Sequence, residues 1–326
     1  MMIFQNIDIN KIRRMAFEQL FSSLSYISSY QPAVRKAESS CMIYENIVYG
    51  PAESPYNLLD VYRPKVKHEL MPVLIYIHGG GFTMCSKDTH RPVALAYAGR
   101  DYLVFNINYR LAPKYRYPCA VEDICLAYEW IVKNAHQYGG NIKKIAVAGD
   151  SAGANLALAL IAACCYPMTI PEVQSAWQTD VIPKAAQLMC GLYQVSNPDR
   201  FEKKLHAPNA FIGNFHLDIA KSVSKAYLGN RYQEHSQDLA LADPLVILES
   251  DLIPERPLPA IYAMTAENDI IFSDTERLEQ ALIEKNVVHD VQYYPKEGHV
   301  FHLLFWKEIA REAWRDGFRF LSQYCS

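Results

Sequence analysis

The sequence has no excess of charge of either sign. Its 326 residues include 32 Lys and Arg against 35 Asp and Glu, which gives a formal net charge of −3. The two signs are mixed along the chain. A protein that holds nucleic acid through its phosphates needs a basic face. We therefore expect no nucleic-acid partner.

Long apolar runs are also missing. The apolar stretch at residues 154–165 is shorter than the roughly 20 residues that a membrane-spanning helix needs. The first residues lack the basic segment and following apolar run that are typical of a secretory signal. These absences predict a cytoplasmic protein with no membrane span.

The cysteines follow neither a metal-binding nor a disulfide-framework spacing. Of the eight, Cys125, Cys164 and Cys165 lie in helix-like runs, and Cys190 lies in an apolar strand-like run. Because such placements are typical of reduced core thiols, we expect no disulfide framework and no metal site.

Apolar runs of strand length alternate with helix-like segments over most of the chain. This alternation predicts an α/β fold in which helices flank a mostly parallel central sheet. Two further extended segments, separated by Gly50-Pro51, predict an antiparallel hairpin at a sheet edge. The expected strands are residues 41–49, 57–62, 72–77, 103–107, 145–148, 185–193, 260–265 and 291–294, and the expected helices are residues 118–136, 154–165, 274–285 and a C-terminal helix from about Val300.

Two segments stand outside this alternation. Residues 1–40 are partly helical in pattern, with apolar side chains at the spacing of one helix face at Phe17, Leu20, Phe21 and Leu24. Residues 196–250 mix aromatic, asparagine and charged residues. An insertion of this kind, placed between strands, predicts a cap over the active-site end of the sheet.

The segment Gly149-Asp150-Ser151-Ala152-Gly153 lies between a predicted buried strand and a predicted helix. A Gly-x-Ser-x-Gly turn in this context places the serine on a sharp bend, where side chains at the two glycine positions would collide with neighbouring backbone. The bend exposes the hydroxyl of Ser151 at a helix N-terminus, which favours developing negative charge. Taken alone, the pentapeptide also fits an ordinary turn in which the serine caps the helix.

A second glycine-rich segment, His78-Gly79-Gly80-Gly81-Phe82, follows another predicted buried strand. Three consecutive glycines allow the backbone to direct N–H groups at one point, as an oxyanion hole requires. The alternative is a phosphate-binding loop, but neither Gly-x-Gly-x-x-Gly nor Gly-Lys-Ser/Thr is present.

Asp269 and His299 each follow a predicted strand. Because parallel strands end at one edge of a sheet, these side chains can converge with Ser151. Two alternatives stay open: Asp269 only caps the next helix and Asp274 is the acid, or His299 and His302 bind a metal, although no acidic or cysteine cluster accompanies them. We expect structural roles for Asp150 and Asp123.

In the order Ser, Asp, His, and in several motifs, the chain resembles the hormone-sensitive-lipase-like group of α/β-hydrolases. The resemblance covers residues 72–302 and implies an α/β-hydrolase fold in a single domain, residues 1–326, with a helical cap from about 1–40 and about 196–250. It implies Ser151 as nucleophile, His299 as base and Asp269 as its orienting acid, with the oxyanion hole formed by the N–H groups of Gly80, Gly81 and Ala152. The matching motifs are His78-Gly79-Gly80-Gly81-Phe82, Tyr109-Arg110-Leu111-Ala112-Pro113, Pro118-x-Ala120-x-x-Asp123, Gly149-Asp150-Ser151-Ala152-Gly153-Ala154-Asn155, Glu267-x-Asp269 and Gly298-His299-Val300-Phe301.

The resemblance implies a serine carboxylesterase that hydrolyses short-to-medium acyl esters through an acyl-enzyme, with a small-molecule ester as substrate and no cofactor. Monomer and homodimer both stay open. The chain departs from the group at Lys114, where glutamate is usual, and at Ile270-Ile271, where proline and leucine are common. The alternatives are an amide-cleaving N-formyl hydrolase similar to kynurenine formamidase and a non-catalytic hydrolase-fold binding protein. Proteins of the latter kind typically lose a triad member, and this chain keeps all three.

Overall fold

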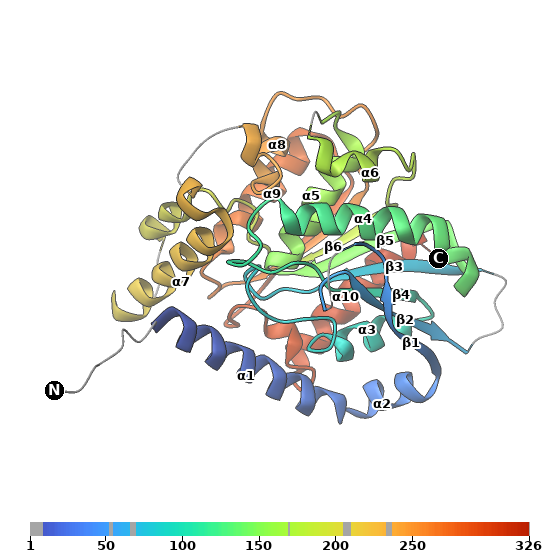
Figure 1. The fold of residues 1–326 in the computed structure, drawn as a ribbon. Coiled ribbons are helices and arrows are strands. Elements are labelled where there is room, and N and C mark those ends of the chain that lie inside the picture. The colour runs from blue at the N-terminus through green and yellow to red at the C-terminus, as the bar shows by residue number, and fades with distance from the viewer. Residues whose placement is uncertain are drawn as a thin grey trace.

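The structure, a computed structural model, describes residues 9–51, 55–65, 70–168, 170–204, 210–232 and 237–325. These residues form one eight-stranded sheet in the order β1-β2-β4-β3-β5-β6-β7-β8 (Figure 1). Strand β2 runs antiparallel to β1 and β4, and the remaining neighbours are parallel. The predicted edge hairpin and mostly parallel sheet are therefore confirmed. The strands are β1 (Cys41–Val48), β2 (Leu58–Pro64), β3 (Met71–Ile77), β4 (Leu103–Ile107), β5 (Gly140–Asp150), β6 (Ala185–Met189), β7 (Ala260–Ala266) and β8 (His289–Tyr294).

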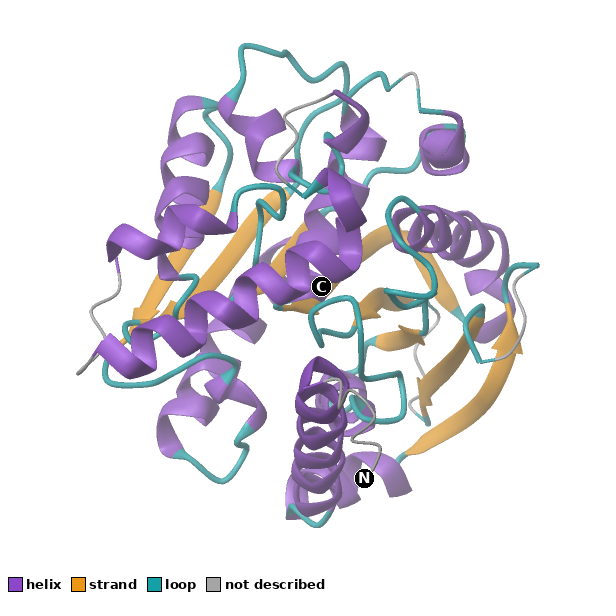
Figure 2. Ribbon diagram, turned by 60° about the vertical axis from the view of Figure 1, so that its left-hand side comes forward, coloured by secondary structure: helices purple, strands orange, loops and turns teal. Residues whose placement is uncertain are grey.

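Helices cover both faces of the sheet (Figures 1 and 2). One face packs against α4 (Cys119–Asn134), α5 (Ala152–Cys165) and α9 (Phe272–Glu284). The other packs against α3 (Arg91–Ala98) and α10 (Glu308–Cys325), with α1 (Ile9–Ser29) and α2 (Pro32–Ser39) outside α3. This three-layer arrangement is the expected α/β-hydrolase architecture.

Strand β3 shows why a central strand reads as one continuous apolar run. Val73, Ile75 and Ile77 enter the core on the α5 face, whereas Leu74 and Tyr76 enter the core on the α10 face. Successive side chains of a strand point to opposite faces, and here both faces are covered. Helix α5 is likewise buried on all sides, which explains an apolar composition without membrane contact.

Two predicted boundaries were wrong. The strand expected to reach residue 193 ends at Met189, because Cys190 takes a positive φ of 50° that breaks the extended backbone. The C-terminal helix begins at Glu308 rather than near Val300, which is itself left-handed and is followed by a short 3₁₀ turn (Phe301–Leu303). His299 therefore lies in the loop before α10, well separated from the start of that helix.

The predicted apolar face of the N-terminal helix is correct only in part. Phe21 packs against the core on the α10 face, but Leu20 is 51% exposed. The packed face instead runs through Phe21, Leu24 and Ser28, a spacing that keeps side chains on one side of a helix. Residues 1–8 of the predicted cap lie outside the described residues.

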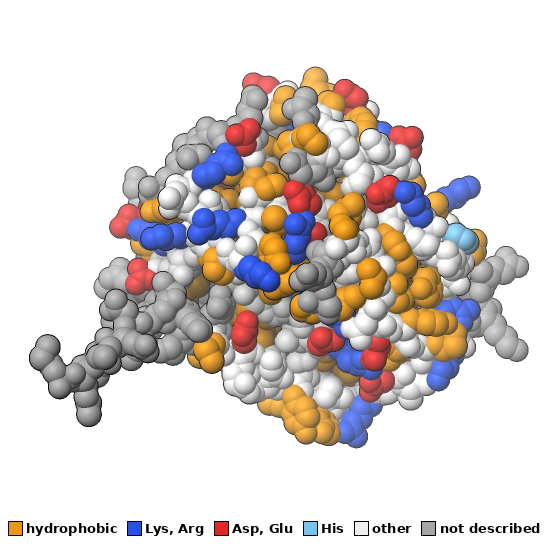
Figure 3. All heavy atoms as spheres, in the orientation of Figure 1, with side chains coloured by type: hydrophobic (Ala, Val, Ile, Leu, Met, Phe, Trp, Pro, Cys, Tyr) orange, Lys and Arg blue, Asp and Glu red, His pale blue; other side chains and the backbone are white. Residues whose placement is uncertain are grey.

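The segment predicted as the main cap contains the 3₁₀ turn η3 (Pro198–Lys204) and helices α7 (Ala210–Leu228) and α8 (Pro244–Glu249). Helix α7 lies at the left of the molecule in Figure 1, beyond the sheet. Lys and Arg side chains are interspersed with Asp and Glu on the face shown in Figure 3. Within the described ranges, no helix combines the length and the apolar character that crossing a membrane requires.

Candidate active site

Ser151 occupies the sharp turn between β5 and α5, with φ 52° and ψ −114°. The two flanking glycines leave no room for a side chain. A Cβ at Gly149 would lie 2.5 Å from the carbonyl group of Gly153, and a Cβ at Gly153 would lie 2.1 Å from the Ile77 oxygen. The predicted reason for glycine at both positions is confirmed.

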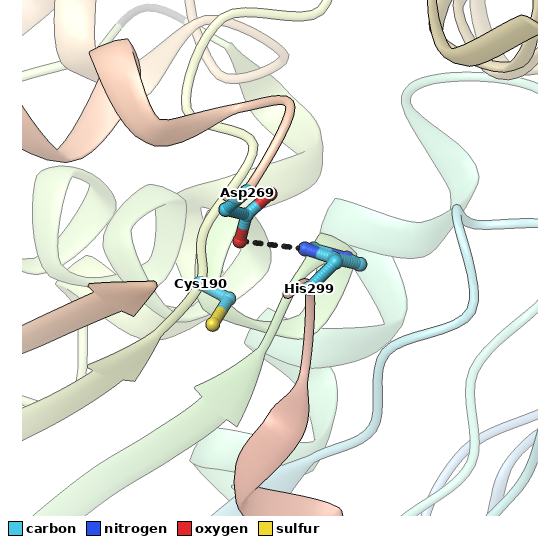
Figure 4. Close-up of side chains that lie close together, drawn as sticks. All are labelled: Cys190, Asp269 and His299. Atoms are coloured by element: carbon cyan, nitrogen blue, oxygen red, sulfur yellow. Dashed lines mark hydrogen bonds and ion pairs between the residues drawn. The ribbon is translucent and has the colours of Figure 1, made fainter. Parts of the chain in front are cut away.

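The structure brings Ser151, Asp269 and His299 together from the ends of β5, β7 and β8. His299 Nδ1 lies 2.8 Å from Asp269 Oδ2, and His299 Nε2 lies 3.0 Å from Ser151 Oγ (Figure 4 draws the first contact). The ionised carboxylate only accepts hydrogen bonds, so Nδ1 donates to it and Nε2 is left to accept from the serine hydroxyl. The backbone N–H of Ile271 donates to Asp269 Oδ1 at 3.1 Å and fixes the carboxylate from its other side.

The alternative acid is engaged elsewhere. Asp274 is buried and accepts two hydrogen bonds from the Arg200 guanidinium, at 2.9 and 2.6 Å, and one from the Tyr193 N–H at 2.8 Å. It therefore ties the inserted segment to α9. His302 is 1% exposed, and burial lowers its pKa to about 4. These contacts favour Asp269 and His299 over Asp274 and His302.

Cys190, predicted only as a reduced thiol, lies beside the Asp–His pair. Its sulfur, a carboxylate oxygen of Asp269 and a ring nitrogen of His299 lie within 4.8 Å of one another (Figure 4). The signal was available, because the residue after β6 must lie between the ends of β5 and β7. Burial raises the pKa of the Cys190 thiol well above its usual value. His299 Nδ1 and Asp269 Oδ2 already contact each other at 2.8 Å, so the group fits the predicted Asp–His pair beside a buried thiol better than a metal centre.

The predicted oxyanion loop, residues 78–82, follows β3, which pairs with β5 up to Ile77 and Gly149, two residues before Ser151. Gly80 and Gly81 have positive φ values of 104° and 58°, which glycine adopts without strain. In the described part of the chain, the N–H groups of Gly80, Gly81 and Ala152 donate to no acceptor. Ala152 is also the first residue of α5, whose N-terminus favours negative charge. These three donors are free to bind a substrate oxygen.

Asp150 joins this loop to the serine turn. It is 1% exposed, and its Oδ1 accepts from the Gly79 N–H at 3.0 Å and from the Tyr76 hydroxyl at 2.6 Å. Burial acts to raise the pKa of this carboxyl, but His90, His302 and the Tyr76 hydrogen bond outweigh it, so the pKa is lowered. The carboxylate is thus kept ionised as a fixed acceptor. The expected structural role of Asp150 is confirmed.

Asp123 and Lys114 contact neighbouring side chains. Asp123 is fully buried against Arg110, with 3.0 Å from Nε to Oδ1, as expected for a structural residue. Lys114, which departs from the group's usual glutamate, has its ammonium 4.8 Å from the ring centroid of Tyr115. A cation there contacts aromatic faces that a carboxylate would avoid.

We expect the pH dependence of turnover to follow from the surroundings of His299, the predicted general base. Burial acts to lower the pKa of this imidazole, but the charge of Asp269 and its hydrogen bond outweigh burial and raise it. A general base must be neutral, so activity falls as pH drops through the raised pKa. We expect the acidic limb of kcat/KM to have its midpoint above about 6.5, the unperturbed value for histidine. A pH profile between pH 4 and 9 measures this limb. A midpoint near 4 would instead indicate a group such as His302.

A hollow of about 920 Å³ lies far from these residues, at the opposite end of the strands. Its lining includes Arg100, Tyr102, Arg315 and Arg319, and it contains no residue of the Ser–His–Asp group. Its size alone does not make it a reaction site, because neither Ser151 nor His299 lines it.

Known proteins are similar in sequence over most of this chain. A family model described as "alpha/beta hydrolase fold" matches residues 74–303. The acetyl esterase of Salmonella schwarzengrund is 31% identical over 255 residues, or 76% of this chain and 71% of that protein. The carboxylesterase NlhH of Mycobacterium tuberculosis is 46% identical over 97 residues, so this match spans only 30% of that protein and 29% of this chain.

Solved structures show the same fold. An esterase from Pyrobaculum calidifontis superposes with a TM-score of 0.76 at 24% identity, covering 99% of this chain and 96% of that one. A structure named bacterial heroin esterase also has a TM-score of 0.76, at 21% identity, and the match covers 98% of this chain and 92% of that one. The chain belongs to the α/β-hydrolase fold family. Its predicted place in the hormone-sensitive-lipase-like group is confirmed.

Proposed function

We propose that this protein is a serine carboxylesterase that hydrolyses short-to-medium acyl esters through an acyl-enzyme, with Ser151, His299 and Asp269 as its triad. The observation that carries the proposal is the position of the His299 ring, which lies 3.0 Å from the Ser151 hydroxyl and 2.8 Å from Asp269. The similarity to a carboxylesterase and an acetyl esterase supports it.

In the first half of the reaction, His299 Nε2 takes the proton of Ser151 as Oγ attacks the ester carbonyl carbon. Asp269 holds the ring in the required tautomer and stabilises the imidazolium that forms. The carbonyl oxygen becomes an oxyanion, which accepts hydrogen bonds from the N–H groups of Gly80, Gly81 and Ala152. A donor of this kind contributes about 3 kcal/mol in comparable sites.

The imidazolium then protonates the leaving alcohol, and the acyl group remains on Ser151. In the second half, His299 removes a proton from water as the water attacks the acyl carbon. Collapse of the second tetrahedral intermediate releases the acid and returns the proton to Ser151. Both halves use the same base and the same oxyanion hole.

The two alternatives lack a specific observation in their favour. An N-formyl hydrolase would use the same triad and glycine loop, and a binding protein would have no need for an aligned serine–histidine pair. Labelling with a fluorophosphonate separates enzyme from binding protein, because only an activated serine reacts. Rates on matched esters and N-formyl amines separate the two enzymes. The carboxylesterase proposal would be abandoned if the amides were hydrolysed faster.

We also propose that the protein forms one domain, with a cap made of about residues 1–40 and 196–250. Support comes from α7, which packs beside the oxyanion loop, as Val223 does against Gly81. Of the aromatic residues that the sequence suggests as pocket walls, Phe201 and Tyr227 are buried in the protein. The side chains of Phe211 and Phe215 lie outside the described residues.

Acyl-chain preference tests the substrate class. Each added methylene contributes about 0.8 kcal/mol only while it finds buried surface. We expect kcat/KM for p-nitrophenyl esters to rise with chain length, reach its maximum in the range of roughly C2 to C8 and then collapse. The series runs from acetate to palmitate, with emulsified triolein alongside. A steady rise to palmitate, or activation at the oil surface, would indicate a lipase instead.

A further inference from the structure

The oxyanion loop holds a conformation that its own residues do not account for. After Gly80 and Gly81, Phe82 also has a positive φ, 61°. A bulky residue in this region costs on the order of 1–3 kcal/mol and persists only where its surroundings hold it. Within the loop, the Thr83 and Met84 N–H groups donate to the Gly80 oxygen at 3.1 and 3.2 Å. These bonds close the turn but do not hold the Phe82 side chain.

The Phe82 side chain is held from α7. Its ring stacks on Tyr227, with centroids 3.9 Å apart and planes at 5°, and both residues are fully buried. The Phe82 carbonyl is anchored on the other side by the Ala112 N–H at 2.9 Å. The strained residue is thus clamped between the inserted helix and the segment after β4.

A second residue of the same helix face contacts the glycine next to Phe82. Val223 lies one turn before Tyr227, and its Cγ2 is 3.0 Å from the position that a Cβ on Gly81 would take. The end of α7 is held in turn, because the Tyr117 N–H donates to the Tyr227 oxygen at 3.0 Å. Two consecutive loop residues therefore take their positions from α7.

We propose that Tyr227, supported by Val223, is a positioning residue for the oxyanion hole, so that α7 determines the rate of turnover as well as covering the substrate. The proposal rests on the carboxylesterase function proposed above. Tyr227 reaches the reaction only through Phe82 and the N–H groups of Gly80 and Gly81. Those donors act on charge that develops in the transition state, so their misplacement lowers kcat more than it changes KM.

The test compares Tyr227→Leu with Tyr227→Phe. Phenylalanine keeps the stacked ring and loses only a hydroxyl that has no hydrogen-bond partner among the described residues. We expect Tyr227→Leu to lose roughly 10- to 100-fold in kcat on p-nitrophenyl acetate, with KM within about threefold of the parent value. The loss in kcat should stay at or below this range, because complete removal of one oxyanion donor lowers kcat by about 10²–10³. Tyr227→Phe should stay within about twofold of the parent. Tyr128→Leu is the matched control, because it removes a buried tyrosine of α4 whose hydroxyl bonds the Val181 oxygen.

Amide hydrogen exchange provides a readout that does not depend on turnover. The Thr83 and Met84 amides should exchange at least about tenfold faster in Tyr227→Leu, and at the parent rate in Tyr227→Phe and Tyr128→Leu. If the parent hydrolyses no ester and resists fluorophosphonate, the proposed function fails, and this exchange comparison still decides the positioning role.

The proposal is overturned if Tyr227→Leu keeps kcat within about twofold, or if Tyr128→Leu loses as much. It is also overturned if the Thr83 and Met84 amides exchange at the parent rate in Tyr227→Leu. Should Tyr227→Leu not fold, Val223→Ala replaces it, because it removes the methyl groups nearest Gly81 and keeps the stack of Tyr227 on Phe82. We expect Val223→Ala to lose about three- to tenfold in kcat, and an unchanged kcat in that variant would reject the proposal.

Discussion

Replacing Ser151 by alanine is expected to remove ester hydrolysis while the protein stays folded. The change deletes only the hydroxyl that lies 3.0 Å from His299 Nε2. Without it no acyl-enzyme forms, and the loss in kcat should be on the order of 10⁶, as in a comparable triad. The fold should survive, because the Ser151 backbone keeps its hydrogen bond to the Met189 oxygen at 2.8 Å. The measurements are kcat for p-nitrophenyl acetate, fluorophosphonate labelling and circular dichroism.

Ser175→Ala is the matched control for that variant. Its hydroxyl is buried without a hydrogen-bond partner among the described residues, in a short helix, α6 (Gln174–Trp177), that packs against α5. We expect parent rates and labelling from it. If Ser151→Ala were folded and still turned over at a rate near that of the parent, Ser151 could not be the nucleophile.

Replacing Asp269 by asparagine should be the next most damaging change, at about 10⁴ in kcat. The amide matches the carboxylate in size but can present an N–H to His299 Nδ1. The ring then takes the tautomer with hydrogen on Nε2, which cannot accept the Ser151 proton. The acidic limb of the pH profile should also move to lower pH, because the charge of Asp269 and its hydrogen bond contribute most to raising the pKa of His299.

Asp274→Asn separates this effect from the loss of any buried carboxylate nearby. Asp274 bonds Arg200 and the N–H of Tyr193, so its replacement should lower thermal stability and leave kcat within about tenfold. Thermal unfolding and kcat are measured on both variants. If Asp274→Asn lost far more activity than Asp269→Asn, the acid would have to be reassigned to Asp274.

Much of the fold was predictable because its signals are local. Strand β3 and helix α5 are long apolar runs, and Gly149 of the serine turn is required by its close approach to Gly153, four residues further on. The site residues also follow a local rule, since each lies within five residues after the end of a strand. Parallel strands end at one edge, so the order of motifs already predicts which side chains can meet.

The errors arose where the backbone turns without a strong sequence signal. Cys190 and Val300 have left-handed conformations that only surrounding contacts impose. As a result, β6 ends before Cys190, and α10 begins later than the apolar pattern after Val300 suggests. In the same way, Leu20 has the spacing of a packed helix face, but the position of α3 decides which face of α1 is buried.

The sequence by itself determined the fold class and predicted the nucleophile and the base, because apolar periodicity and strand-end motifs are properties of short segments. It left Asp269 and Asp274 both open as the acid. Only the tertiary structure decided that Asp269 rather than Asp274 contacts His299, that Cys190 lies beside this pair, and that Tyr227 stacks on Phe82. Each of these is a contact between segments far apart in the chain. Such a contact forms only when sheet register and helix packing together place the two segments within a few ångströms of each other. The sequence of one segment cannot determine that placement.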